Sequence, residues 1–503
     1  MVLKGLRYPE ISALEQIEIS FSIDTSSVGL TLPCSGKQLY DWACGVEQKV
    51  CDALDSFITP TDGLPGHDYL IALDIIKYPF ILYAGQPITE RVLLMLDDVH
   101  KLTWEQRRFL REELIDNRLP VGIWMAERLE ALGVEELLSE GAILGRDHEG
   151  VINLEAFWRG NRRFEGVVKN IADCRVREAA DTDIESFNGC LQNSLDGEKW
   201  QNKFAEGKLI VSERVRSSAD QKQRYIQWVS EREQQKGTEK DNAIAWKTLE
   251  ILIDREERKP YKQLTIFDLP LEVNELEKRD DSQVRAAAEL FFCKEFKIPY
   301  YYGISRLANI ASSNIEQFLW LTGSLFEVSL SAALLKQPCA LPPNQQQQIL
   351  KQAVEQRWNT LPQQVKYGHD VRKFLEAIGE LSKWETNRPN APYAPGVTGI
   401  AISMADRDKL QDPQQLAKDP GLAQLSRVIQ ICVAYNFLEV VVDAKQGQKG
   451  GQRWMLLYLN RMLCVHFDLP LTYGGWRPQS LTKLFRWLQR GFLPPKKEPE
   501  LWL

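Results

Sequence analysis

Two short apolar runs stand out in the first third of the chain. The first, residues 92–96, is uninterrupted and ends in two carboxylates, Asp97 and Asp98. A helix-like segment over residues 103–117 separates it from the second run, residues 120–126. In a parallel sheet that is covered by helices on both faces, each strand is a continuous run of hydrophobic residues. The pattern therefore predicts two buried parallel strands joined by a helix.

Residues 16–24 show a different pattern, because apolar and polar side chains alternate along them. Alternation is typical of a strand with one polar face. We interpret this segment as the second strand of the same core and residues 38–57 as the helix that precedes the run at 92–96.

The middle of the chain reads as helical. Residues 175–290 are rich in charge, and we expect a solvated helical hairpin or insertion with mobile loops near residues 234–237. A more apolar helical pattern returns over residues 286–336.

The C-terminal third has a mixed pattern. Two helical segments, residues 344–360 and 370–383, precede a short apolar strand at 396–402. A helix over residues 422–434 leads into two β-rich runs joined by the glycine-containing loop 443–451, which predicts a β-hairpin.

The composition is that of a multidomain soluble protein. The 503 residues are 44% hydrophobic and 26% charged, enough for about three domains of ordinary size. No segment reaches the roughly 18 apolar residues of a membrane helix and no signal peptide is evident, so we expect a cytoplasmic protein without membrane contact. The nine cysteines and five histidines lack metal-binding spacings, which favours reduced thiols.

Paired carboxylates at the end of a buried strand suit phosphate chemistry. Ligands bind outside the carboxyl ends of parallel strands, where Asp97 and Asp98 fall. Because Mg²⁺ prefers oxygen ligands, we expect Asp97 to hold the metal and Asp98 to orient the water that attacks a γ-phosphate. The alternative is a buried strand that meets solvent at an acidic turn.

The phosphate-binding loop that should accompany such a strand is missing. No Gly-x-x-x-x-Gly-Lys-Ser/Thr pattern occurs, and in the nearest approach, residues 31–38, Thr31 replaces the first glycine and Gln38 the magnesium-binding hydroxyl. Lys37 is the candidate phosphate ligand of that segment. We expect that the first core strand and the loop lie upstream of Met1, or that the protein is a degenerate ATPase.

The order of these elements resembles P-loop ATPases of the AAA+ or STAND kind, in which a Walker B strand precedes a helix and a sensor strand. The resemblance places Glu127 or Arg128 at the sensor position beside the nucleotide. It implies ATP and Mg²⁺ as cofactors. It also implies a homo-oligomer in which Arg146 reaches the neighbouring subunit's nucleotide, although a surface arginine in a turn is the equal alternative.

Residues 302–319 are similar to the lid helix of origin-recognition-type AAA+ ATPases, in which an Asn-led helix presents a sensor arginine. Glu316 stands where that arginine is expected, and Arg306 is the nearest substitute. An ordinary amphipathic core helix is the alternative.

The C-terminal pattern resembles the winged helix that follows the lid in these ATPases. The chain has a net charge of −7, yet residues 445–490 contain eight basic residues and the single acid Asp468. Placed cations suffice to contact a polyanion. We therefore expect DNA contacts from Lys445, Lys449, Arg453, Arg461, Lys483, Arg486 and Arg490. A protein effector or a merely solvated face are the alternatives.

Together these patterns predict a P-loop NTPase-like α/β core, a parallel sheet with flanking helices, in residues 1–165. An all-α lid with the charged insertion follows in residues 166–340, and a winged-helix-like domain in residues 341–503. The predicted function is an ATPase switch acting on or near DNA, in prokaryotic antiphage defence or mobile-element biology. The competing hypothesis is a nucleotide-free scaffold that binds DNA or a partner protein through the winged helix.

Overall fold

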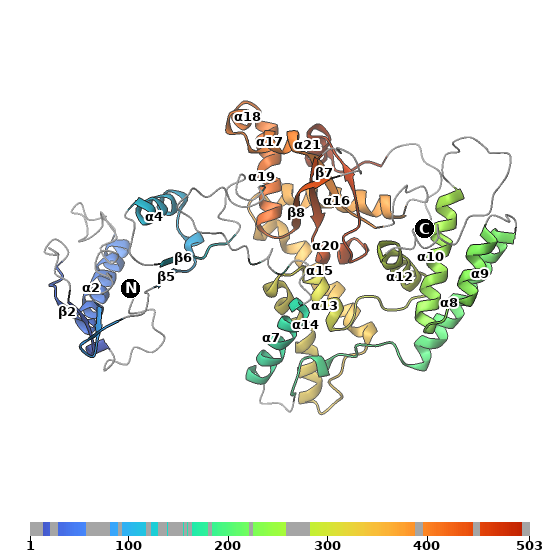
Figure 1. The fold of residues 1–503 in the computed structure, drawn as a ribbon, viewed down its shortest axis with the longest axis horizontal. Coiled ribbons are helices and arrows are strands. Elements are labelled where there is room, and N and C mark those ends of the chain that lie inside the picture. The colour runs from blue at the N-terminus through green and yellow to red at the C-terminus, as the bar shows by residue number, and fades with distance from the viewer. Residues whose placement is uncertain are drawn as a thin grey trace. The chain divides into compact units, whose positions relative to one another are not determined.

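The chain divides into two compact units, Met1–Ala131 and Leu132–Leu503 (Figure 1). The computed structural model describes residues 14–20, 29–56, 81–88, 93–116, 122–128, 138, 154, 158, 163–179, 184–220, 225–257, 282–387, 396–445 and 453–494.

Four short strands form an antiparallel sheet in the first unit. Its order is β2-β1-β3-β4, with β1 at Ile17–Ile19, β2 at Cys34–Ser35, β3 at Ile81–Tyr83 and β4 at Gln86–Pro87. The prediction that residues 16–24 contribute to the parallel core is wrong, because β1 pairs antiparallel with both of its neighbours. One-sided burial explains the alternation: Ile19 packs in an apolar cluster with Leu30 and Cys34, whereas Glu18 is exposed.

Helix α2, Gly36–Asp55, follows β2 and confirms the helix predicted over residues 38–57. Its start is closed by a capping box. The Gln38 N–H donates to the Ser35 hydroxyl at 3.2 Å, and the Ser35 N–H donates to the Gln38 side-chain oxygen at 2.8 Å. Two backbone donors at this helix start are therefore satisfied within the chain.

Strands β5 (Leu93–Leu96) and β6 (Gly122–Met125) are parallel and pair in register. Between them in the chain come the short 3₁₀ turn η2, Val99–Lys101, and helix α4, Trp104–Asp116. The predicted pair of parallel strands joined by a helix is confirmed. The described residues of this sheet comprise these two strands, so the larger parallel core stays a prediction.

One face of the β5–β6 pair is open in the described part of the chain. Leu93, Met95 and Trp124 are 43%, 67% and 61% exposed. The alternating residues Leu94 and Ile123 are partly buried. The expectation of two strands covered on both faces is therefore not met by the residues that the structure describes.

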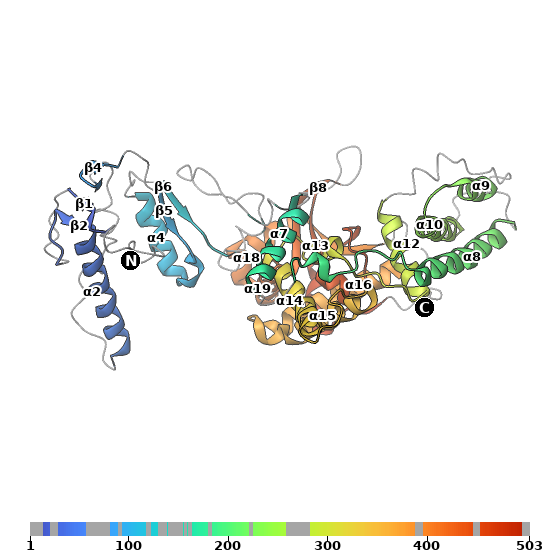
Figure 2. The same cartoon turned by 90° about the horizontal axis from the view of Figure 1, so that it is seen from below.

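The second unit begins with a helical region (Figure 2). Its helices are α7 (Arg163–Ala179), α8 (Glu198–Asp220), α9 (Ile226–Gln234), α10 (Glu239–Glu257), α12 (Ser282–Glu295), α13 (Ile304–Ile310) and α14 (Ile315–Leu334). Helices are found in the described parts of residues 175–290, as predicted, and the hairpin or insertion stays a prediction, although the charged helices also pack on one another. Helix α10 packs against α8 and α12, and the three helices bury Phe204, Trp246 and Phe292.

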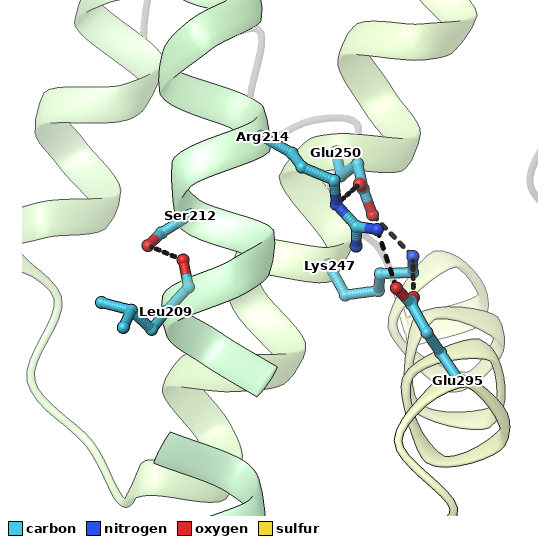
Figure 3. Close-up of polar contacts among 6 residues, drawn as sticks. All are labelled: Leu209, Ser212, Arg214, Lys247, Glu250 and Glu295. Carbon is cyan, nitrogen blue, oxygen red and sulfur yellow. Dashed lines mark hydrogen bonds and ion pairs between the residues drawn. The ribbon is translucent and has the colours of Figure 1, made fainter. Parts of the chain in front are cut away.

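Ion pairs connect these three helices at the edge of their apolar contacts (Figure 3). Arg214 on α8 reaches Glu250 on α10 at 2.9 Å and Glu295 on α12 at 2.8 Å. Lys247 on α10 also reaches Glu295, at 2.8 Å. Burial alone would raise the pKa of the Glu295 carboxyl. The hydrogen bonds from Arg214 and Lys247 outweigh this effect, so the pKa of Glu295 is lowered. Charged side chains that the sequence suggested would face solvent therefore form ion pairs between neighbouring helices.

Helices and a four-stranded sheet form the C-terminal part of this unit. The helices are α15 (Pro343–Gln364), α16 (Gly368–Asn387), α17 (Met404–Gln411), α18 (Pro413–Lys418), α19 (Pro420–Ala434), α20 (Arg461–His466) and α21 (Leu481–Arg490). The sheet order is β10-β7-β9-β8, with β7 at Val397–Ser403, β8 at Leu438–Lys445, β9 at Arg453–Leu459 and β10 at Gly475–Pro478. The predicted β8–β9 hairpin is confirmed. Strand β10, which pairs parallel with β7, was not predicted, and neither were helices α17, α18, α20 and α21.

Two glycines in helix interiors should respond oppositely to substitution by alanine. In α16, a Cβ atom on Gly379 would lie 2.3 Å from the Phe467 ring, which is itself buried. Gly379→Ala should therefore lower the free energy of unfolding by about 1–3 kcal/mol through overpacking. The measurement is denaturant unfolding of the full chain followed by circular dichroism.

Gly323 on α14 is the matched control, because a Cβ atom there would have no neighbour within 4 Å. Gly323→Ala should raise the free energy of unfolding by about 0.5–1 kcal/mol, since alanine has the higher helix propensity. Equal effects of the two substitutions would contradict the packing of α16 against Phe467.

Candidate functional site

The carboxyl ends of β5 and β6 are held together by two backbone hydrogen bonds. The Ala126 N–H donates to the Leu96 carbonyl at 2.8 Å, and the Val99 N–H donates to the Ala126 carbonyl at 3.1 Å. The parallel ladder therefore continues past the last residue of each strand. It brings the turn that contains Asp97 and Asp98 next to the residues that follow β6.

Asp98 occupies a left-handed backbone conformation with φ 56° and ψ 30° at the start of η2. Its carboxylate accepts a hydrogen bond from Lys101 and lies 3.8 Å from Nδ1 of His100. The Lys101 hydrogen bond is the main cause that lowers the pKa of Asp98, and the charges of Lys101, His100 and Arg128 add to it. Asp98 is therefore kept ionised in a positively charged environment.

Asp97 lies beside it with its side chain at the open end of β5. It is exposed, and its Oδ1 accepts the Asp98 N–H at 2.8 Å. Nδ1 of His100 is buried and makes no hydrogen bond with any residue that the structure describes. The turn thus combines two carboxylates with an unsatisfied imidazole nitrogen and the exposed cation Lys101.

Glu127 lies at the end of β6 but its carboxylate turns toward α4. It pairs with Arg107 at 3.5 Å and also with Arg111, and only 16% of its side chain is exposed. Two arginines of α4 thus pair with Glu127, and its predicted contact with the cofactor stays a prediction. Arg128 is exposed, and its charge acts on Asp98.

Lys37 lies in the first turn of α2, where its ammonium group is 3.5 Å from Glu15. The capping box of Ser35 and Gln38 occupies the backbone donors that a phosphate-binding loop would present. This arrangement differs from a phosphate-binding loop, and the predicted role of Lys37 in nucleotide binding stays a prediction.

A family comparison covers both the β5–β6 site and the C-terminal region. The ORC-CDC6-like family model matches residues 71–477. The chain belongs to the ORC-CDC6-like family. Membership supports the resemblance to origin-recognition-type AAA+ ATPases. Lys37 and helix α2 precede the matched residues, whereas Asp97 and Asp98 lie within them.

Searches of curated proteins and of solved structures found no significant match to this ORC-CDC6-like chain. None of the described helices combines the length and apolar character needed to span a membrane. The described residues also contain no cluster of three or more histidine, cysteine or carboxylate side chains suited to a metal ion.

The donors at the end of β5 nevertheless fit Mg²⁺ in an ORC-CDC6-like protein. Magnesium in nucleotide sites takes one or two protein carboxylates, and water and phosphate complete its ligands. Asp97 and Asp98 supply two hard oxygen donors on adjacent residues. Lys101 and Arg128 supply positive charge on the same side, which suits an anionic phosphate.

The lid substitute Arg306 is engaged inside the ORC-CDC6-like chain. Its guanidinium pairs with Glu289 at 2.7 Å and lies 3.9 Å from the Tyr300 ring centroid. Lys240 reaches the same carboxylate at 2.9 Å. This partly buried cluster joins α10, α12 and α13, so Arg306 contributes to helix packing, and a sensor role for it stays a prediction. Glu316 lies in the first turn of α14.

The predicted DNA-binding residues fall in different settings. Arg461 is engaged within the fold: Nε donates to the Leu471 carbonyl at 2.7 Å, and the guanidinium lies 4.0 Å from the Tyr473 ring. The predicted contact of Arg461 with DNA stays a prediction. Arg453 is exposed at the start of β9. Lys483, Arg486 and Arg490 are exposed on α21.

Three predicted residues lie wholly or partly outside the described structure. Arg146 and Lys449 are outside the described residues, and so is the side chain of Lys445 at the end of β8. Lys101 is the functional candidate that the sequence-based prediction missed. Its position three residues after Asp98 is the spacing that could have identified it.

Lys101→Ala should raise the pKa of Asp98 toward that of an ordinary aspartate, because Lys101 provides the main stabilisation of the ionised form. The pKa is measured by NMR titration of the labelled side-chain carboxyl carbon. Lys49→Ala, at an exposed position on α2, is the control and should leave the Asp98 pKa unchanged. An unchanged pKa in Lys101→Ala would contradict the assigned hydrogen bond.

Proposed function

We propose that the protein binds and hydrolyses ATP with Mg²⁺ at the carboxyl end of β5 and that its nucleotide state controls a DNA-binding C-terminal module. One observation carries this proposal. The parallel β5–β6 pair brings the Asp97–Asp98 turn beside Arg128, in a chain that belongs to an AAA+-type family. Ligands of open α/β sheets bind at this end of the strands.

The proposed chemistry divides the work between two carboxylates. Asp97 is exposed at the strand end and would hold Mg²⁺, which supplies positive charge that neutralises phosphate oxygens. Asp98 has a lowered pKa, so it suits orienting a water better than accepting a proton from it. Lys101 holds the Asp98 carboxylate in place, and Arg128 adds positive charge nearby.

The order of elements in the C-terminal region supports the proposed winged helix. Helix α16 precedes β7, helices α17 to α19 follow, β8 and β9 form a hairpin, and α20, β10 and α21 come after it. In the sheet, β9 lies between β7 and β8, so the hairpin returns onto the first strand. This order supports a DNA-binding winged helix in which α19 is the second helix of a helix-turn-helix.

The proposed switch involves more than one copy of the chain. Arg146 would contact the nucleotide of a neighbouring subunit, and this role stays a prediction because Arg146 lies outside the described residues. A role in antiphage defence or mobile-element biology and a protein effector stay predictions in the same way.

A nucleotide-free scaffold is the second candidate, and one observation favours it. The residues nearest in sequence to a P-loop form a capping box and an ion pair with Glu15 instead. A scaffold would keep the fold and bind DNA or a protein through the C-terminal module without any Mg²⁺-dependent nucleotide binding.

Asp98→Asn should reduce ATP turnover by about 10²-fold or more while Mg-ATP binding persists, because the amide cannot orient water as a carboxylate does. The measurements are steady-state phosphate release and isothermal titration calorimetry with Mg-ATP on the full chain. Glu105→Gln, which removes an exposed carboxylate from α4, is the control and should leave both unchanged.

The outcomes separate the two candidates. Turnover that survives Asp98→Asn would remove the role assigned to Asp98. Absence of Mg-ATP binding by the unaltered chain would favour the scaffold.

A further inference from the structure

Helix α21 presents three cations without partners among the described residues. Lys483, Arg486 and Arg490 are exposed, and their spacing of three and four residues places them on one face. The other face buries Leu484, Trp487 and Leu488. The helix contains no acid, and its cations make no ion pair with a described residue; Lys483 lies 5.8 Å from the Trp487 ring.

Several other cations of the second unit are neutralised by carboxylates. Lys409 pairs with Asp406 at 2.8 Å, Lys351 with Asp468 at 2.8 Å, and Arg477 with the buried Glu385 at 2.7 Å. A cation that already has a carboxylate partner gains less from a phosphate, because the existing pair must first be broken. The unpaired face of α21 is therefore the stronger anion-binding surface.

The segment that leads into α19, the helix that topology would place in a DNA groove, has the opposite character, although α19 itself carries the exposed Arg427 and no acid. From α17 to the first turn of α19, residues 404–422 contain four acids and three bases, a net charge of −1. Asp419 caps α19 and accepts the Gly421 and Leu422 N–H groups at 2.9 and 3.0 Å. A carboxylate at this position repels phosphate and occupies the donors that would bind it.

Helix α21 also covers the start of α19. The two helices pack together (Figure 1), and a Cβ atom on Gly421 would lie 2.8 Å from Cζ of Phe485. The Phe485 ring therefore lies against the first turn of α19. In helix-turn-helix proteins the N-terminal residues of the second helix contact base edges, so this contact covers a portion of the part of α19 that would read DNA.

We propose that duplex DNA binds across the outer face of α21, with Lys483, Arg486 and Arg490 contacting phosphates, and that α19 does not enter the major groove. The inference rests on the proposed DNA-binding function and specifies its surface. Residues 483 to 490 span about 10 Å of helix. That length matches about three phosphates at 3.4 Å of axis per strand.

This surface predicts a particular kind of binding. Phosphate contacts position a protein on the duplex but carry no direct sequence information. The affinity should therefore depend strongly on salt and weakly on base sequence.

The test compares two triple variants of the full chain that remove the same charge. One is Lys483→Gln, Arg486→Gln and Arg490→Gln on α21. The other is Arg407→Gln, Lys409→Gln and Lys418→Gln on α17 and α18. Binding to a fluorescein-labelled duplex of about 30 base pairs and arbitrary sequence is followed by fluorescence anisotropy over a range of salt concentrations, and thermal unfolding checks that each variant is folded.

The α21 triple variant should bind the duplex at least about tenfold more weakly at 0.1 M salt. In a plot of the logarithm of the affinity against the logarithm of the salt concentration, its slope should be smaller in magnitude by about 2.7, which is about 0.9 for each lost phosphate contact. The α17–α18 triple should change the slope by much less. The charge-retaining triple Lys483→Arg, Arg486→Lys and Arg490→Lys should restore most of the affinity, which a structural role of these side chains would not predict.

Each remaining outcome is decisive. A larger loss in the α17–α18 triple than in the α21 triple would overturn the inference and leave the proposed DNA binding intact. No binding by the unaltered chain would remove the DNA-binding part of the proposed function and the inference with it. If the α21 triple variant binds DNA as tightly as the unaltered chain, the inference is overturned. An anionic protein would then be the candidate partner of this face of α21.

Discussion

The candidate nucleotide site depends on the register between β5 and β6. Two hydrogen bonds beyond the paired residues, from Ala126 to Leu96 and from Val99 to Ala126, keep the strand ends together. The side-chain period of a strand is two residues, so a slip of one residue would turn the partly buried Ile123 to the open face and separate the strand ends. The proximity of Asp98 to Arg128 is a consequence of this register.

In the second unit, a buried pair of amides connects the lid-like helix to the C-terminal sheet. The Gln317 side chain on α14 donates to Asn460 at 3.0 Å and accepts from it at 3.2 Å. Asn460 follows β9 and caps α20. Buried polar groups of this kind are costly unless every donor and acceptor is satisfied. The pair therefore specifies one arrangement of α14 relative to the turn after β9.

The distribution of ion pairs distinguishes structural charges from candidate functional ones. Glu127, Arg306 and Arg214 each find opposite charges on neighbouring helices, and their side chains stabilise helix packing. Asp98 and Lys101 form a local pair at an open strand end. The cations of α21 have no acidic partner among the described residues. They therefore give this face of the surface a positive electrostatic potential. A chain with a net charge of −7 can therefore still present a basic face.

The sequence by itself determined the elements with strong local signals. The apolar run before Asp97, the amphipathic helices and the glycine loop of the β8–β9 hairpin were predictable because hydrophobic period and turn chemistry act over a few residues. The order of elements also indicated the family. Tertiary structure decided what local patterns cannot encode: the antiparallel pairing of β1, the capture of Glu127 by Arg107 and Arg111, and the burial of Arg306 against Glu289. Strand partners and ion-pair partners are chosen across long separations in the chain, where packing geometry and desolvation decide which charge meets which.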